Sequence, residues 1–115
     1  MKKVNILKSR YDLDKDNKRK IEYGLSQSAE TMLSGIYNLS NVVKTEFTTE
    51  DGEIIESYVY VTDEGLIRSR SEALKNSADT AFEFMEDGEE SSVEVKLVKR
   101  KAKNSGREYY AFIIV

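Results

Sequence analysis

The sequence predicts a mostly β domain in which one helix interrupts a series of antiparallel strands. Residues 35–47 and 53–62 alternate apolar and polar side chains with the period of two that half-buried strands show. Residues 70–85 instead repeat apolar side chains at helical spacing. Proline is absent and seven tyrosines are present, which fits a strand-rich domain. A chain of 115 residues is expected to form one domain.

The composition excludes most enzyme chemistry. Without cysteine or histidine, the chain lacks thiol nucleophiles, disulfides, imidazole bases and the usual zinc ligands. No spacing resembles a nucleophile elbow or a phosphate loop, so we expect neither catalytic residues nor a cofactor. No apolar run approaches the roughly 20 residues of a membrane span, and the N-terminus lacks a signal-peptide apolar core. We therefore expect a cytoplasmic protein without a membrane partner.

The first 33 residues are predicted to form a β-hairpin followed by a polar connector. Residues 4–13 and 18–24 are extended in pattern, with the polar turn 14–17 between them. The connector, residues 26–34, is either a loop or one short helix over 29–33.

A calcium loop in this region is rejected. Asp12, Asp14 and Asp16 alternate as calcium ligands do. However, Asn17 stands where such a loop needs glycine, and Tyr23 stands where it needs a bidentate glutamate. We therefore predict no metal site.

Two long strands follow and are expected to pair through the turn Glu50-Asp51-Gly52. In the first, one face holds Tyr37, Leu39, Val43 and Phe47, and the other holds Asn38, Ser40, Lys44 and Glu46. In the second, Ile55, Val59 and Val61 suit a core, whereas Glu56, Tyr58 and Tyr60 point to the opposite side. The pattern thus predicts two outward tyrosines.

A short third strand, residues 66–68, leads into the helix. Ser69 and Glu72 have the spacing of a capping box, and Gly88 is a suitable terminator. Apolar residues on one face of the helix are Leu74, Ala78, Ala81, Phe82 and Met85. A fourth strand over 92–101 and a fifth over 107–115 form the closing hairpin, with a turn at 104–106.

The order of three strands, one helix and two strands matches a five-stranded Greek-key barrel of the oligonucleotide-binding (OB) type over residues 34–115. The N-terminal hairpin is then an extension. In such barrels the second and third strands bind the ligand, together with the loops between strands 1 and 2 and between strands 4 and 5. Tyr58, Tyr60 and Arg68 would line that face, and the basic turn 99–107 would overhang it.

The closing hairpin combines cations with aromatic rings. Its cations are Lys96, Lys99, Arg100, Lys101, Lys103 and Arg107, and they lead directly into Tyr109, Tyr110 and Phe112. Cations and flat rings together suit single-stranded nucleic acid. Because the last strand is apolar on both faces, we assign its aromatic residues to the core or to a subunit interface. The stacking role then falls to Tyr58 and Tyr60.

The net charge of −3 hides a strong segregation of charge. Residues 1–20 carry +5, residues 21–93 carry −12 and residues 94–115 carry +4. Within a Debye length of about 8 Å, local charge matters more than the sum. An acidic protein can thus bind a polyanion if the fold gathers its basic ends, including Lys2, Lys3, Lys8 and Arg10, into one patch. Basic ends that are merely solvated are the alternative.

The chain resembles the compact single-stranded DNA-binding proteins of phages, particularly those of lactococcal phages. The likeness rests on length, on element order and on three segments, IIESYVYVTDEG, SRSEALKNSADTAF and VEVKLVKRKAKNSGREYYAFIIV. The resemblance implies an OB barrel that coats single strands during phage replication or recombination, commonly as a dimer or larger oligomer. It implies stacking by Tyr58 and Tyr60 and backbone contacts from the six hairpin cations. The chain ends in Ile113-Ile114-Val115 rather than in the acidic tail that many such proteins use to recruit partners.

We therefore predict a protein that binds single-stranded DNA, with replication or recombination proteins as further partners. Its predicted site also includes Arg68 and Lys44. One alternative is an acidic interaction module built on ten carboxylates, Glu50, Asp51, Glu53, Glu56, Asp63, Glu64, Glu86, Asp87, Glu89 and Glu90. Another is a phage accessory or structural protein in which residues 109–115 form an assembly seam.

Overall fold

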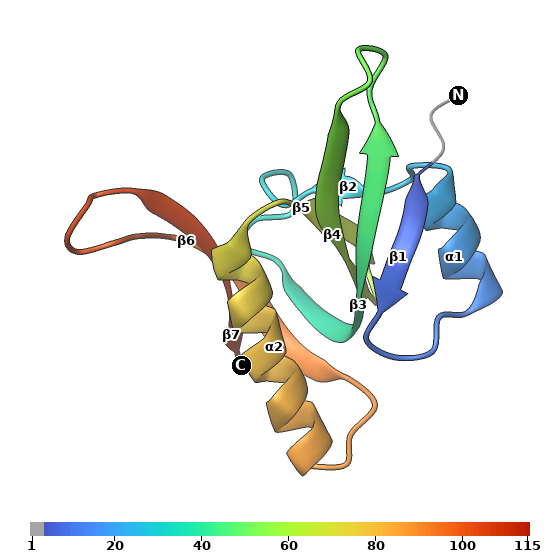
Figure 1. Ribbon diagram of the computed structural model, residues 1–115. Coiled ribbons are helices and arrows are strands. Elements are labelled where there is room, and N and C mark those ends of the chain that lie inside the picture. Colours follow the sequence, from blue (N-terminus) through green and yellow to red (C-terminus); the bar gives the residue numbers. More distant parts are fainter. Residues whose placement is uncertain (1–3) are drawn as a thin grey trace.

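Seven strands and two helices follow one another in the computed structural model, which describes residues 4–115 (Figure 1). In chain order they are β1 (Asn5–Ser9), α1 (Lys15–Glu22), β2 (Gln27–Ser28), β3 (Ile36–Thr48), β4 (Ile54–Thr62), β5 (Gly65–Ser69), α2 (Glu72–Asp87), β6 (Val93–Lys101) and β7 (Glu108–Ile114). The mostly β composition predicted from the sequence is confirmed. Lys2 and Lys3, named above as possible additions to a basic patch, lie outside the described residues.

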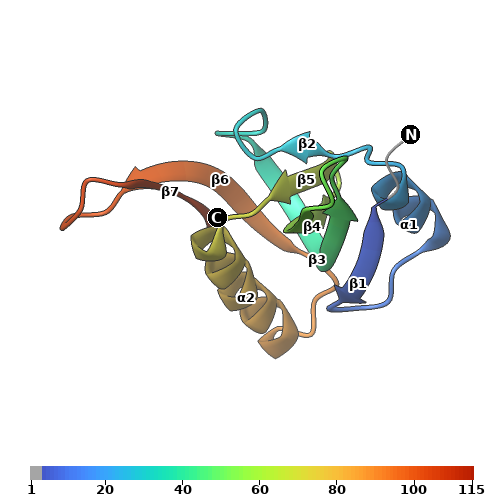
Figure 2. The same ribbon diagram turned by 45° about the horizontal axis from the view of Figure 1, so that its top comes forward.

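The strands form one mixed sheet in the order β2-β5-β4-β3-β6-β7, and β1 also pairs with β3. The meander β3-β4-β5 is antiparallel, and after α2 the chain returns so that β6 lies beside β3. This is Greek-key connectivity. The sheet curls around α2 (Figure 2). Among the described strands no ladder joins β7 to β5 or β2, so the curled sheet is open at β2 and β7, and β1, which pairs with β3 alone, is a further edge strand.

Strand β3 bends at a bulge beside Ser40, and the bend divides its pairing. Before the bulge β3 pairs with β6, after it with β1, and β4 runs along its other edge. An extra residue in a strand reverses the faces that follow it. Tyr37 and Leu39 therefore contact the main core, whereas Val43 joins a second core on the opposite side of the sheet. The single face predicted for these three residues is wrong.

The buried amide of Asn41 holds this bend in place. Its Oδ1 accepts hydrogen bonds from the backbone N–H of Tyr11 at 3.0 Å and of Val42 at 2.9 Å. Its Nδ2 donates to the carbonyl oxygens of Tyr11 at 3.2 Å and Asp12 at 3.4 Å. Asn41 thus ties the chain leaving β1 to the bulge, and it supplies partners for polar groups that the ladder leaves free.

The prediction of a second strand in the N-terminal hairpin is wrong, because residues 15–22 form the helix α1. Asp14 caps the helix, its Oδ2 accepting the N–H of Asn17 at 3.1 Å. Ile21 is the one buried residue of α1 and packs into the second core, beside Val59 and Val61. The connector is neither a plain loop nor a helix, since Gln27 and Ser28 form the short strand β2 parallel to β5.

Helix α2 covers the concave side of the sheet. Its five predicted apolar residues, Leu74, Ala78, Ala81, Phe82 and Met85, are all buried, which confirms the predicted face. The helix begins later than the capping-box pattern indicates, because Ser71 and not Ser69 accepts the N–H of Leu74. Ser69 is still in β5, where it pairs with Tyr58. Gly88 follows the last helical residue, as predicted.

Both faces of β4 are covered, and this overturns the outward orientation predicted for Tyr60. Tyr60 is 0% exposed and packs edge-to-face against Phe112, with ring centroids 5.1 Å apart. Burial raises the pKa of its hydroxyl above the ordinary value, and the hydroxyl has no hydrogen-bond partner in the described structure. Tyr58 is half-buried against the same core. The side chains of β4 do alternate between the two faces of the sheet, as predicted. Neither face is open to solvent, however, because α1 covers one and α2 with β7 covers the other.

Replacing Asn41 should destabilise the protein far more than replacing another asparagine of β3. Asn41→Ala leaves buried backbone groups of Tyr11 and Val42 without a partner, which should cost about 3 kcal/mol of unfolding free energy. Asn38→Ala, whose Nδ2 donates to Asp63 at the surface, is the control and should cost less than about 1 kcal/mol. Urea unfolding checks both. Similar losses would contradict the structural importance of the bulge.

Two tyrosine hydroxyls should differ in their effect on stability. Tyr60→Phe removes a buried hydroxyl that has no partner, so the melting temperature should stay level or rise. Tyr37→Phe removes a hydrogen bond of 2.6 Å to the carbonyl oxygen of Met32 and should cost about 1 kcal/mol. Thermal unfolding followed by circular dichroism compares the two. A larger loss for Tyr60→Phe would show that its hydroxyl has a partner in solution.

Candidate nucleic-acid interface

The β6–β7 hairpin projects away from the rest of the protein and carries the predicted cations (Figures 1 and 2). We call residues 96–107 the basic hairpin. Its turn is closed by the N–H of Gly106, which donates to the carbonyl of Ala102 at 3.0 Å, and Gly106 has the positive φ of 67° that glycine tolerates best. All six cations are exposed, and within the described structure only Lys99 forms an ion pair. The other five are electrostatically available.

The two faces of the hairpin differ. Lys99 pairs in register with Tyr110, on the face that carries the core residues Leu97 and Phe112. On the opposite face Arg100 lies across from Tyr109, and Lys96 lies across from Ile113. The assignment of the closing aromatic residues to the core holds fully for Phe112, which is buried. Tyr109 and Tyr110 are half-buried.

Glu30, in the β2–β3 connection, forms polar contacts with one cation and one aromatic residue of the hairpin. Lys99 Nζ lies 2.9 Å from Glu30 Oε2 and 5.5 Å from the centroid of the Tyr110 ring. The Tyr110 hydroxyl donates a hydrogen bond to Glu30. That bond and the one from Lys99 hold the pKa of Glu30 below its usual value, and Glu30 in turn raises the pKa of Lys99 and of Tyr110. The carboxylate of Glu30 therefore stays charged beside Lys99 and Tyr110.

A surface cavity of about 390 Å³ lies next to this contact, and we call it the hairpin groove. It is lined by Ser28, Ala29, Glu30, Phe47, Ile55, Ser57, Arg68, Ser69, Arg70 and Tyr110. The groove brings the predicted Arg68 together with a second arginine, Arg70, and with the rings of Phe47 and Tyr110. Arg68 Nη1 donates to the carbonyl oxygen and the hydroxyl of Ser26, at 3.0 and 3.1 Å. These bonds position its guanidinium at the groove.

The predicted grouping of Tyr58, Tyr60 and Arg68 on one face is wrong. Arg68 pairs with Val59, whereas Tyr58 pairs with Ser69 and Tyr60 with Ile67. Because neighbouring residues of a strand point to opposite faces, Arg68 lies on the α1 side of the sheet and the two tyrosines lie on the α2 side. Tyr60 is inaccessible there.

Lys44 and Tyr58 share a different cavity. They are partners across β3 and β4, and Lys8 is the neighbour of Lys44 on β1. We call this cavity the β1–α2 pocket. Its lining residues are Lys8, Arg10, Val42, Lys44, Tyr58 and Lys75, and its volume is about 360 Å³. Lys44 Nζ lies 3.6 Å from Glu56 Oε2. The predicted site residues are thus divided between two faces of the sheet.

Several residues of these cavities were not found by sequence reasoning. Arg70, Phe47 and Glu30 join the hairpin groove, and Lys75 joins the β1–α2 pocket. Only Lys75 could have been found from the sequence, because it lies next to the apolar face of the predicted helix. The other three come from segments that are far apart in the sequence. Their proximity depends on how the sheet curls.

The basic N-terminal segment does not extend the basic hairpin. Helix α1 with its lysines lies on the opposite side of the molecule from the hairpin (Figures 1 and 2). Of the described N-terminal cations named for this purpose, Lys8 and Arg10 line the β1–α2 pocket instead. The fold therefore separates the two basic ends of the sequence.

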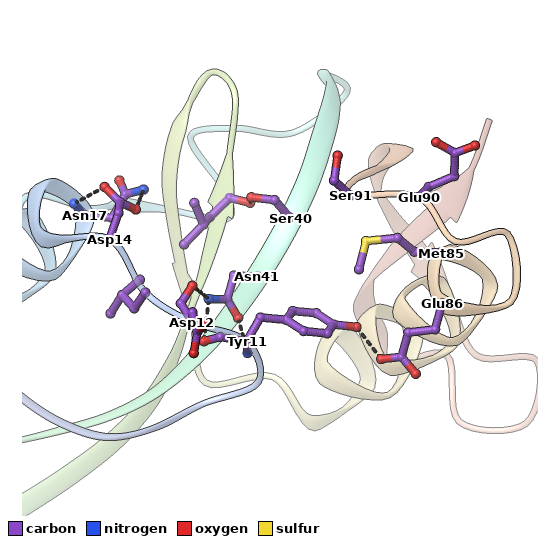
Figure 3. A pocket seen from close by; sticks show the side chains of 12 residues that line it. Tyr11, Asp12, Asp14, Asn17, Ser40, Asn41, Met85, Glu86, Glu90 and Ser91 are labelled. Atoms are coloured by element: carbon purple, nitrogen blue, oxygen red, sulfur yellow. Dashed lines mark hydrogen bonds between the residues drawn. The ribbon is translucent and has the colours of Figure 1, made fainter.

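The largest cavity of those described, about 670 Å³, is acidic and lies between the β1–α1 connection, the bulge of β3 and the end of α2 (Figure 3). Asp12, Asp14, Glu86 and Glu90 line it. Several of its polar groups have local partners, since Asp14 caps α1 and Glu86 accepts hydrogen bonds from Tyr11 and Arg10. Within residues 4–115 no group of three or more acidic residues is arranged to hold a metal ion.

Comparison of the chain with protein-family models, with curated proteins and with solved structures finds no match. Neither helix in the described part of the chain has the length and apolar character needed to span a membrane.

Proposed function

We propose that this protein binds single-stranded DNA without sequence specificity, through the basic hairpin and the hairpin groove. The observation that carries the proposal is the set of five exposed cations with no carboxylate partner in the described structure, Lys96, Arg100, Lys101, Lys103 and Arg107. The groove lies on the Tyr110 side of the hairpin, opposite Lys96 and Arg100, and offers two arginines and two aromatic rings. Cations along a backbone track and rings beside it are what sequence-tolerant binding requires.

The Greek-key order supports an OB-type barrel as the scaffold. In that fold the ligand crosses the second and third strands between the loop joining strands 1 and 2 and the loop joining strands 4 and 5. The corresponding elements here are β4 and β5, the β3–β4 turn and the tip of the basic hairpin. Arg68 on β5 lines the hairpin groove, together with Phe47 of β3, Ile55 of β4 and Tyr110 of β7. The likeness to phage proteins of this class points in the same direction.

The proposed mechanism is non-catalytic. As phosphates meet the hairpin cations, condensed counterions are released, so affinity falls steeply with salt. A base that stacks on Phe47, or on Tyr110 once Lys99 has moved from its ring to a phosphate, would add roughly 1 to 3 kcal/mol with little regard to its identity. Arg68 and Arg70 then neutralise phosphates between the stacked bases. Coating of single strands during phage DNA replication or recombination is the process that this chemistry serves.

The face of β7 turned away from α2 supports self-association as part of this function. Only β6 pairs with β7 among the described strands, but the outer edge of β7 is partly occupied, because the N–H of Phe112 donates to Ser77 Oγ of α2 at 2.9 Å. Tyr109 and Ile113 are half-buried on the face turned away from α2. A second copy that packs against this face would place two basic hairpins side by side.

The acidic-module alternative has less support. Glu50, Asp51 and Glu53 lie at the β3–β4 turn, whereas Glu86 to Glu90 lie at the far end of α2, at the opposite end of the molecule (Figure 1). The acidic residues therefore do not form one continuous docking surface.

Neutralising two hairpin lysines should weaken binding to oligo-dT specifically. Lys101→Gln with Lys103→Gln should lower affinity about tenfold at low salt and reduce the slope of log affinity against log salt by about 1.4, since each single-strand phosphate contact contributes about 0.7. Lys15→Gln with Lys18→Gln on α1 is the control of equal charge. Fluorescence anisotropy with oligo-dT and duplex DNA at two salt concentrations measures both. Failure to bind oligo-dT, or equal losses in both variants, would reject the proposal.

Removing the carboxylate of Glu30 should strengthen the same binding. Glu30→Gln frees Lys99 and Tyr110 from an anion that occupies the position of a phosphate, so affinity for oligo-dT should rise about threefold to tenfold at low salt. The matched control is Glu83→Gln, an exposed residue of α2. The anisotropy titration described above compares the two. An equal rise in both variants would mean that only net charge matters and would remove Lys99 from the site.

A further inference from the structure

The β1–α2 pocket is lined by four cations and no acidic residue. Lys8 and Arg10 come from β1 and the residue after it, Lys44 from β3 and Lys75 from α2. The apolar part of the lining is Val42 and the half-buried ring of Tyr58. A volume of about 360 Å³ lies near the lower end of the range of about 300 to 1,000 Å³ for small-molecule sites. The pocket is large enough for one small ligand.

The carboxylates that contact these cations lie outside the lining and hold the side chains in position. Arg10 Nη1 is 3.3 Å from Asp79 Oδ1, and its Nη2 is 3.2 Å from Glu86 Oε2. Lys75 Nζ is 2.7 Å from Asp79 Oδ1. Cations that are fixed in advance lose less freedom when an anion arrives. Asp79, Glu86 and Glu56 together offset three of the four charges, so one positive charge stays uncompensated.

Lys8 and Lys44 are the cations most available to a ligand. Lys8 is exposed and has no ion pair in the described structure, and Lys44 meets Glu56 only at 3.6 Å. Across the pocket, Lys75 Nζ lies 5.4 Å from the centroid of the Tyr58 ring. This cation–π contact occupies the ring and holds the ammonium beside the pocket. Tyr58 therefore positions a cation, which differs from the base-stacking role predicted for it.

We propose that the β1–α2 pocket binds the terminal phosphate of a nucleotide, a phosphomonoester. Lys8, which has no carboxylate partner in the described structure, and Lys44, which meets Glu56 only at 3.6 Å, can both contact the phosphate. Two such contacts suit a group that carries close to two negative charges at neutral pH better than a phosphodiester, which carries one. Val42 and the edge of Tyr58 contact the sugar. This phosphate belongs either to a free nucleoside monophosphate or to the 5′ end of a strand. The pocket lies on the opposite face of the sheet from Arg68, so this proposal does not depend on the hairpin groove.

Calorimetric titration with thymidine monophosphate, thymidine, inorganic phosphate and dimethyl phosphate tests the pocket. Thymidine monophosphate and inorganic phosphate should bind, whereas thymidine and dimethyl phosphate should not. Lys8→Gln should weaken the binding of thymidine monophosphate about tenfold, as expected for the loss of a charge-assisted contact. Lys18→Gln, which removes an exposed lysine of α1, is the control and should change affinity less than twofold. Equal effects of the two variants, or binding of thymidine as tight as that of its phosphate, would overturn the proposal.

The location and the source of the phosphate are tested separately. Amide shifts on adding thymidine monophosphate should cluster at residues 8–10, 42–44, 58 and 75, and the variant with Lys101→Gln and Lys103→Gln should bind it like the natural chain. Loss of this binding in that hairpin variant would place the phosphate on the hairpin and reject the pocket. If strand ends are the source, 5′-phosphorylated oligo-dT should bind more tightly than the 5′-hydroxyl form, and Lys8→Gln should abolish the difference. Equal oligonucleotide affinities with retained nucleotide binding would identify the free nucleotide as the ligand.

Discussion

The bend of β3 at Ser40, held by the amide of Asn41, sets the positions of the other strands and of α2. A straight strand of 13 residues would give β1 and β6 the same flat edge. The bulge turns β3 so that its first half carries β6 and β7 and its second half carries β1. The concave side that results is filled by α2, and the basic hairpin projects beyond the body of the protein (Figure 1). A buried amide that satisfies four backbone groups makes this geometry specific.

The same curl separates the positive charge of the chain into two places with different character. On the basic hairpin five cations stand in solvent without carboxylate partners in the described structure, which suits a mobile polyanion bound through many weak contacts. In the β1–α2 pocket the cations are mostly paired, and carboxylates of α2 fix Arg10 and Lys75. Fixed cations suit a small ligand of defined shape. The two proposed phosphate sites thus differ in how their cations are held, in a protein of net negative charge.

Much of the fold could be predicted because its signals are local. The apolar face of α2, the alternation of Val93, Val95 and Leu97 and the order of the last five strands and the helix depend on periodicity, and the structure confirms them. Helix α1 was missed because a short run of charged residues around one apolar residue, Ile21, has no clear period. The face of Val43 was missed because a bulge adds one residue without a glycine or proline to mark it.

For the candidate site, the chemistry follows from the amino-acid sequence alone, because a hairpin turn crowded with lysine and arginine is expected to be exposed to solvent. Which aromatic residues accompany these cations depends on long-range packing. Alternation along β4 places Tyr58 and Tyr60 on one side, but it does not reveal that α2 and β7 bury Tyr60 there. The sequence pattern also does not predict that Tyr110 and Arg68 line one groove, or that Lys8 and Lys44 line one pocket. These pairings arise from the register and curvature of the sheet, and both depend on contacts between residues distant in the sequence.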